Sequence, residues 1–336
     1  MPKIIPPVSF NATGVATFYF VPESGRYVIE VAGAQGGGNA AAQGGKGSRL
    51  RGVFNLRAGE VINLVIGQRG LPGLDLPLGE ETVTGSFLQE ISSLIPTLAR
   101  GGGGGGGTFV WKNTLTGGRP DWPMLAAGGG GGASAGPGGD AVVTPDASRV
   151  DGPGGRNGHG GSSDTGLFYY GGGGGSGWLS AGDQGAGPTY CQGGAHWKGG
   201  AGASFGGYSG GHGGYGGGGG GCFFRSGAGG GGGYSGGCGG GGRTSVSGGG
   251  GGSYNSGAEQ SNVPGVQMGD GWIRISFLTP TVTLRVPDLN ARDSQPADVP
   301  PSLTRKMPVQ EILQAQNSPA YEFRLPPTSR WQYQPG

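Results

Sequence analysis

The sequence predicts a mainly β protein, in which an antiparallel β-sandwich carries an inserted bundle of polyglycine II helices and is followed by an extended C-terminal tail. Apolar residues alternate with polar ones in short runs at both ends of residues 1–286, as strands do. Between these ends lie seven runs of four or more glycines. Residues 279–336 then contain ten prolines and one glycine, so regular structure is not expected there.

The composition limits what the chain can be. Glycine supplies 88 of 336 residues and proline 24, and this content is also typical of low-complexity disorder. Lys and Arg number 22 against 20 Asp and Glu, a net charge of +2. Binding to phosphate backbones needs a basic excess, so we expect no nucleic-acid partner.

The N-terminal residues, the apolar stretches and the cysteines indicate the compartment in which the protein is made and whether it enters a membrane. Prolines interrupt Met1–Pro7 before an apolar stretch can form, and no later stretch reaches about 18 apolar residues. We therefore expect no signal peptide, no transmembrane segment and no membrane insertion. Cys191, Cys222 and Cys238 form no CxxC pair, and their odd number argues against a disulfide framework and fits assembly in a reducing cytoplasm.

Residues 1–100 are expected to form the first half of the sandwich. In residues 26–31, Tyr27, Ile29 and Val31 face one way, and residues 18–21 are expected to pair with them through a hairpin at residues 22–25. Further strands are expected at residues 50–56 and 61–66. Within residues 71–100 we expect a short helical insertion, because the spacing of Ser86 and Gln89 and of Phe87, Ile91, Leu94 and Leu98 is helical.

Residues 101–270 form the glycine-rich block, with strand-like pieces at residues 108–111 and 124–127 between the runs. Residues 271–286 read as closing strands, because Ile273, Ile275 and Phe277 alternate with polar or amphipathic neighbours. The two sequence ends should therefore close one sheet around the block. Residues 287–336 read as an extended, Pro-rich interaction tail.

Two observations favour order over disorder in the glycine block. Flexible glycine linkers lack aromatic residues, whereas many are interleaved here, and leaving them in water costs about 25 cal/mol per Å². Polyglycine II has three residues per turn, and without Cβ atoms neighbouring helices pair N–H with C=O. Because ordering glycine is costly, we expect order only if many runs pack cooperatively and the strands fix their ends.

The order of these segments resembles the glycine-rich domain of the anaplastic lymphoma kinase and leukocyte tyrosine kinase receptors, a family also found in bacterial and viral surface proteins. The resemblance covers roughly residues 18–277. The matching segments are residues 27–34 (YVIEVAGA), 44–47 (GGKG), 52–56 (GVFNL), 64–70 (LVIGQRG), 125–128 (LAAG), 249–255 (GGGGSYN) and 269–273 (GDGWI). It implies a jelly-roll-like sandwich bearing polyglycine II helices, protein binding and no enzymatic activity. The chain is also similar in style to phage glycine-rich tail adhesins.

Catalytic and metal motifs are weakly represented. GxGxxG strings are expected by chance at this glycine content, and none opens a helix of a βαβ unit. The GxSxG strings at Ser209 and Ser235 lack the strand and helix that expose a nucleophile. His159, His196 and His212 share the region of the cysteines, but the spacings match no zinc pattern. We expect no enzyme, no cofactor and no metal.

Aromatic residues between glycine runs are the candidate binding residues, because such connections emerge at the ends of a bundle. The alternative is that these rings only pack on glycine faces. The candidates are Phe168, Tyr169, Tyr170, Trp178, Tyr190, Trp197, Phe223 and Phe224, with Trp331 and Tyr333 as tail anchors. We expect a virion or surface-appendage component, such as a tail fibre or capsid-associated protein, that binds other structural proteins. The alternative is an adhesin for host glycan or protein.

Overall fold

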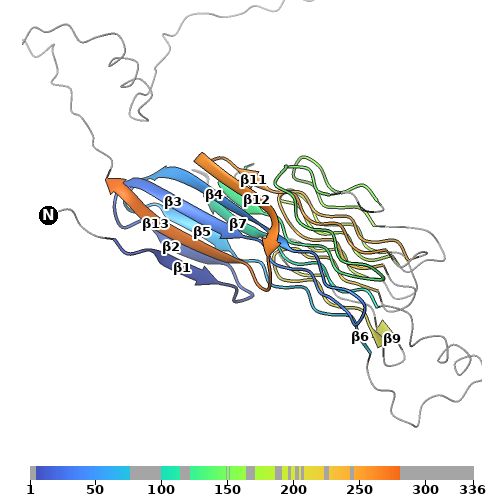
Figure 1. The fold of residues 1–336 in the computed structure, drawn as a ribbon. Coiled ribbons are helices and arrows are strands. Elements are labelled where there is room, and N and C mark those ends of the chain that lie inside the picture. The colour runs from blue at the N-terminus through green and yellow to red at the C-terminus, as the bar shows by residue number, and fades with distance from the viewer. Residues whose placement is uncertain are drawn as a thin grey trace, which may run out of the picture. The chain divides into compact units, whose positions relative to one another are not determined.

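The computed structural model describes residues 5–75, 100–113, 122–148, 150, 152–163, 171–185, 191–195, 198–200, 204–205, 208–222, 227–242 and 246–280. Over these residues the chain is mainly β, with two five-stranded antiparallel sheets and no helix (Figure 1). The chain divides into two units, Met1–Thr281 and Val282–Gly336. The second unit lies outside the described residues, as do the expected helix and the expected tail.

The first sheet joins the two ends of the described chain. Its strand order is β1 (Val8–Asn11), β13 (Trp272–Pro280), β3 (Gly25–Ala32), β4 (Gly47–Leu56) and β12 (Ala258–Gln267). β13 pairs with β3 along eight residue pairs and with β1 on its other side. The prediction that the sequence ends close one sheet is confirmed.

The second sheet is ordered β11 (Tyr254–Asn255), β8 (Leu125–Ala127), β7 (Thr108–Lys112), β5 (Val61–Val65) and β2 (Thr17–Phe20). A small third sheet holds β6 (Leu74–Asp75), β10 (Tyr208–Ser209) and β9 (Ser204–Phe205). Strands were predicted where β2, β3, β4, β5, β7, β8 and β13 lie. β12, which is largely exposed, was not predicted.

The expected hairpin between β2 and β3 is wrong. β2 pairs with β5 in the second sheet, whereas β3 pairs with β4 and β13 in the first. The turn at residues 22–24 therefore crosses between sheets. The crossing lets Val21 and Tyr27 both bury their side chains in the same core, with 1 % and 0 % exposure. Tyr27 also donates a hydrogen bond from its hydroxyl to Glu23 O, at 2.7 Å, which ties the strand to the turn.

The core between the sheets follows the predicted alternation. Buried side chains from both sheets meet there, and those from the first include Tyr27, Ile29, Val31, Ile273 and Ile275. The second sheet contributes Ile62, Leu64, Val110 and Leu125 among others. Burying each such side chain stabilises the fold by roughly 1.5–3 kcal/mol relative to exposure. This core supports the strands from which the glycine runs extend.

Candidate functional site

Glycine runs continue directly from the strands of the sandwich and lie side by side (Figure 1). The run at residues 101–107, which leads into β7, shows how they are joined. Its successive N–H groups donate in turn to the carbonyl oxygens of three neighbouring segments. Residues 101, 104 and 107 donate to Cys222, Gly219 and Gly216 of the first segment. Residues 102 and 105 donate to Ala133 and Gly130 of the second, and residues 103 and 106 to Leu71 and Gln68 of the third. The donors therefore repeat with a period of three residues, and each of these neighbours runs antiparallel.

The carbonyl groups of the same run accept from three further segments. Residues 34–37, 211–214 and 229–232 donate to it, again at intervals of three residues. One glycine run is thus surrounded by six hydrogen-bonded segments, at N···O distances of 2.7 to 3.0 Å. Satisfying buried N–H and C=O groups is obligatory, and here it is achieved without a ladder of neighbouring strands.

The packing leaves no room for side chains. A Cβ atom built on Gly104 would overlap the carbonyl oxygen of Gly230, and one on Gly130 would overlap that of Gly45. The same conflict with neighbouring carbonyls occurs at most of the buried glycines. Glycine is therefore required by close approach of backbones, rather than by backbone conformation, at these positions.

An aromatic layer joins the glycine block to the outer face of the second sheet. Phe109 and Trp111 of β7 pack against Trp178, with ring centroids 5.8 and 5.7 Å apart, and Tyr234 belongs to the same buried cluster. Trp178 and Tyr234 come from turns between glycine runs. These turns therefore anchor the block on the sheet.

One edge of this layer is exposed. Trp122 is 60 % exposed and stacks on Tyr234 and Tyr254, at centroid distances of 6.3 and 6.0 Å. Phe18 and Phe20 of β2 also project from the outer face of this sheet and are about equally exposed. Burial raises the pKa of Tyr234, and the neighbouring Tyr254 raises it further.

Of the predicted binding residues, only Trp178 lies among the described residues. Its side chain is fully buried in the aromatic layer, where it packs against the rings of Phe109 and Trp111. The other candidates lie outside the described part of the chain: Phe168, Tyr169, Tyr170, Tyr190, Trp197, Phe223, Phe224, Trp331 and Tyr333. Those candidates remain predictions.

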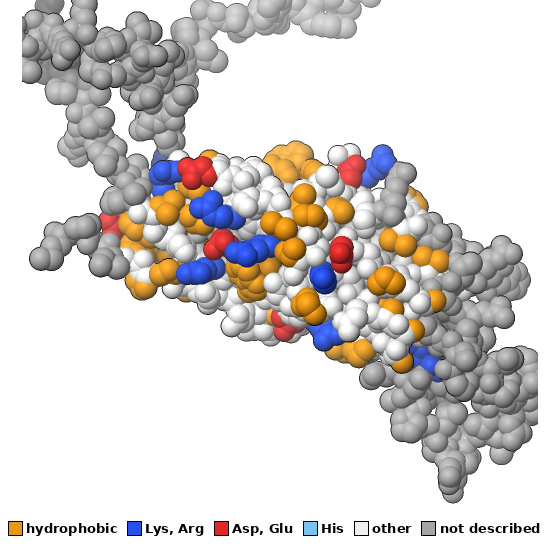
Figure 2. Space-filling view, viewed as in Figure 1, with side chains coloured by type: hydrophobic (Ala, Val, Ile, Leu, Met, Phe, Trp, Pro, Cys, Tyr) orange, Lys and Arg blue, Asp and Glu red, His pale blue; other side chains and the backbone are white. Residues whose placement is uncertain are grey.

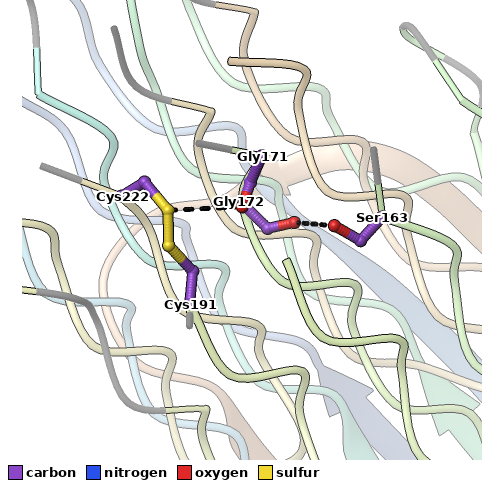
Figure 3. Close-up of a disulfide and its surroundings, with 5 residues drawn as sticks. All are labelled: Ser163, Gly171, Gly172, Cys191 and Cys222. Carbon is purple, nitrogen blue, oxygen red and sulfur yellow. Dashed lines mark hydrogen bonds between the residues drawn. A yellow bond between two sulfur atoms is a disulfide. The ribbon is translucent and has the colours of Figure 1, made fainter. Parts of the chain in front are cut away.

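The sequence argued against a closed disulfide framework and left the fate of the three cysteines open, and the structure shows that one pair is bonded. Cys191 and Cys222 are joined, with Cα atoms 5.7 Å apart across 31 residues of sequence, while Cys238 is free and buried (Figure 3). Cys222 Sγ also lies 3.2 Å from the carbonyl oxygen of Gly171, and the neighbouring Gly172 O accepts a hydrogen bond from Ser163 Oγ. The sequence pattern missed the pair because glycine packing, not sequence spacing, brings the two cysteines together.

Of the motif serines and histidines, Ser235 and His159 have hydrogen-bond partners that the structure describes, whereas His196 and the side chain of Ser209 lie outside the described part of the chain. Ser235 is fully buried, and its hydroxyl accepts a hydrogen bond from Gly158 N at 3.0 Å. His159 Nδ1 lies 3.3 Å from Ser180 Oγ. Within the described ranges, no group of three His, Cys, Asp or Glu side chains is placed to hold a metal ion.

Charged side chains gather on the outer face of the first sheet (Figure 2). Arg26, Arg49, Arg51 and Arg274 project from it together with Glu30 and Glu259. Figure 2 shows blue side chains gathered over the sandwich, with a few red ones among them. In the sequence, Arg26, Glu30, Arg51 and Arg274 alternate with the residues of the core, but only the pairing of the strands shows that they share one face.

Comparison with known families found no matching family model, and no curated protein matches the chain. Among the described residues, no helix has the length and apolar character needed to cross a membrane.

Proposed function

We propose that the glycine runs are polyglycine II helices, packed as a bundle on a jelly-roll-like sandwich. The three-residue repeat of donors around residues 101–107 supports this, because polyglycine II has three residues per turn. Six hydrogen-bonded neighbours around one run are what hexagonal packing of such helices requires. The overlap that any Cβ would cause supports the same arrangement.

We further propose that the protein is a non-enzymatic structural component of a virion or surface appendage. The observation that carries this proposal is the interior of the glycine block, which is joined mainly by hydrogen bonds between backbones and gains stiffness from them. Residues 287–336 bind other structural proteins of the same assembly, with Trp331 and Tyr333 as anchors. Apolar rings of this size supply much of the binding energy in interfaces.

A second role, as an adhesin for cell-surface glycan or protein, is favoured by the disulfide. Cys191 directly follows Tyr190, and Cys222 directly precedes Phe223 and Phe224. The bond therefore fixes the two described residues that border these aromatic segments, one on the C-terminal side of Tyr190 and the other on the N-terminal side of Phe223. Fixing chain positions next to binding loops reduces the conformational entropy that the loops lose when they bind a ligand.

Deletion of the coding sequence in its native genome tests the two roles. Assembled particles or appendages are counted by electron microscopy and then tested for attachment to the host. The structural role predicts fewer or incomplete particles, whereas complete particles that fail to attach would reject it in favour of adhesion. A normal number of complete particles that attach normally to the host would reject both the structural and the adhesin role.

The tail anchors have their own test. Trp331→Ala/Tyr333→Ala is expected to reduce the amount of protein recovered in purified particles, because the rings no longer fill a partner's pockets. Gln332→Ala, at the position between them, serves as the matched control and is expected to leave incorporation unchanged. Equal incorporation of both variants would reject the anchoring role while leaving the structural role open to the deletion test.

A further inference from the structure

The outer face of the first sheet presents charge at wide intervals. Arg51 of β4, Glu30 of β3 and Arg274 of β13 lie in one row across three paired strands. Neighbouring strands are about 4.8 Å apart, so the backbones of the two arginines are separated by roughly 10 Å, with a carboxylate between them. The row therefore alternates positive, negative and positive charge.

The two arginines of this row remain available to a ligand. Glu30 pairs with Arg49, whose Nη2 lies 2.9 Å from Glu30 Oε1, and Glu259 pairs with Arg26. Arg51 donates to the backbone oxygen of Glu259, at 3.1 Å. Neither Arg51 nor Arg274 forms an ion pair with a carboxylate of the described residues. Two guanidinium groups on this face are thus unneutralised.

The surroundings of the row suit hydroxyl groups. Ser9 lies beside Arg274 on β1, Ser261 lies beside Arg51 on β12, and Ser276 projects from the same face of β13. Ser9 and Ser261 are exposed, and Ser276 is partly so. Such side chains both donate and accept hydrogen bonds. The guanidinium of Arg49 lies 5.3 Å from the ring centroid of Trp272, which holds the neighbouring arginine against the sheet.

One of the two edges of this sheet, the one beside Arg51, is poorly suited to an added strand. Its edge strand β12 contains Pro264, positive φ values at Glu259 and Gly265, and two shifts of register against β4. Proline and irregularity of this kind block edge-to-edge pairing. At this edge, a ligand therefore meets side chains on the face rather than regular backbone, which disfavours an acidic peptide added as a strand beside Arg51.

We propose that this face binds an acidic polysaccharide with one carboxylate on every second sugar. Carboxylates one disaccharide apart reach Arg51 and Arg274, and the uncharged sugar between them lies over Glu30. Hydroxyls of the sugars beyond the two arginines bond to Ser9 and Ser261. Duplex DNA carries a charge every ~1.7 Å along its axis, so a phosphate would meet Glu30. This binding is independent of the proposed assembly role, which uses a different part of the chain.

The test uses the full-length protein and a hyaluronan decasaccharide, in which glucuronate alternates with an uncharged sugar. Isothermal titration calorimetry at low salt is expected to show saturable binding that weakens as salt is added. Arg51→Gln/Arg274→Gln is expected to raise the Kd at least about tenfold, because each arginine contributes a charge-assisted hydrogen bond. Arg57→Gln/Arg69→Gln, which removes two exposed arginines outside the face, is the matched control and should leave the Kd unchanged.

Specificity gives a second readout. Glu30→Gln removes the charge between the arginines, so it should improve binding of polygalacturonate, which is charged on every sugar, relative to hyaluronan. The proposal is overturned if hyaluronan does not bind, if Arg51→Gln/Arg274→Gln binds as well as the control, or if Glu30→Gln leaves the preference unchanged. Equal affinity for a single-stranded oligothymidylate would assign the face to nucleic acid instead. None of these outcomes changes particle assembly, so they are distinguishable from failure of the proposed function.

Discussion

At the scale of single residues, the glycines divide into those at which a Cβ atom would overlap a neighbouring backbone and those at which it would not. A Cβ on Gly104 would overlap the backbone oxygen of Gly230, which cannot move without breaking its own segment's hydrogen bonds. Gly136 has nothing within 4 Å of its Cβ position and no positive φ. The two positions therefore form a matched pair in which only the surroundings differ.

Gly104→Ala is expected to lower the free energy of unfolding by about 3 kcal/mol or more, because overpacking forces backbone shifts in a close-packed region. Gly136→Ala should be neutral or slightly stabilising, since alanine restricts the unfolded chain. Urea unfolding, followed by tryptophan fluorescence, measures both. Similar effects at the two sites would mean that the block tolerates side chains and is not packed as described.

Buried tyrosines make stability depend on alkaline pH. Burial is the main cause that raises the pKa of Tyr27 and of Tyr234. The unfolded state then loses its tyrosine protons first, so this contribution to stability is complete below about pH 10 and is lost as pH rises above it. Tyr234→Phe, which removes the ionisable group and keeps the ring, should flatten the fall in unfolding free energy above about pH 10. An unchanged slope would contradict this.

At the scale of elements, period-two alternation identified most strands of the sandwich, because each has one face in the core. β12 was missed because its sequence, AEQSNVPGVQ, includes Pro264 and Gly265 and has no buried side chain to impose alternation. The β2–β3 hairpin was wrongly predicted because a tight turn signal at residues 22–25 also serves a crossing between sheets. Local sequence determines that a strand forms, whereas the partner depends on the whole core.

The candidate sites were less predictable than the strands. Trp178 was recognised as an aromatic residue between glycine runs, but its burial depends on Phe109 and Trp111 of a distant strand. The row of Arg51, Glu30 and Arg274 depends on the register of three strands drawn from both ends of the sequence. Residue type and spacing alone do not contain this register.

The disulfide ties two segments that lie next to aromatic residues, and its loss should be measurable. Closing a loop of this length stabilises a fold by about 3–4 kcal/mol in the chain-entropy model. Unfolding of the wild type is therefore expected to occur at lower urea when reductant is present. Cys191→Ser/Cys222→Ser should unfold at the lower concentration with or without reductant.

Cys238→Ser provides the control for the disulfide, because it removes the free thiol and keeps the bond. This variant is expected to retain its response to reductant. If the wild type shows no response at all, while mass analysis finds the bond intact before reduction, the bond does not contribute to global stability.

At the scale of the folded unit Met1–Thr281, the sandwich and the glycine block share both covalent and packing connections. Four glycine-rich segments adjoin strands: residues 33–38 follow β3, 101–107 precede β7, 128–132 follow β8, and 248–252 precede β11 with Ser253 between them. The aromatic layer of Trp178 and Tyr234 adds a packed contact on the second sheet. Ordering a glycine run costs more than ordering other residues, so these connections are what make the block stable.

This coupling predicts that the block and the sandwich unfold as one cooperative unit. Amide exchange at Gly104, Gly130 and Gly231, each bonded to another segment, should then require the same opening free energy as exchange at Val31 of β3. Ala40, an exposed residue in a loop, should exchange rapidly and serves as the internal reference. If the glycine amides exchange far faster than Val31, the block opens by itself, and the strands only hold its ends. If the glycine amides are instead as protected from exchange as Val31, the glycine block gains its stability from the core of the sandwich. Hydrogen bonds between backbones contribute only about 1 kcal/mol each, which alone does not offset the conformational entropy lost by so many glycines.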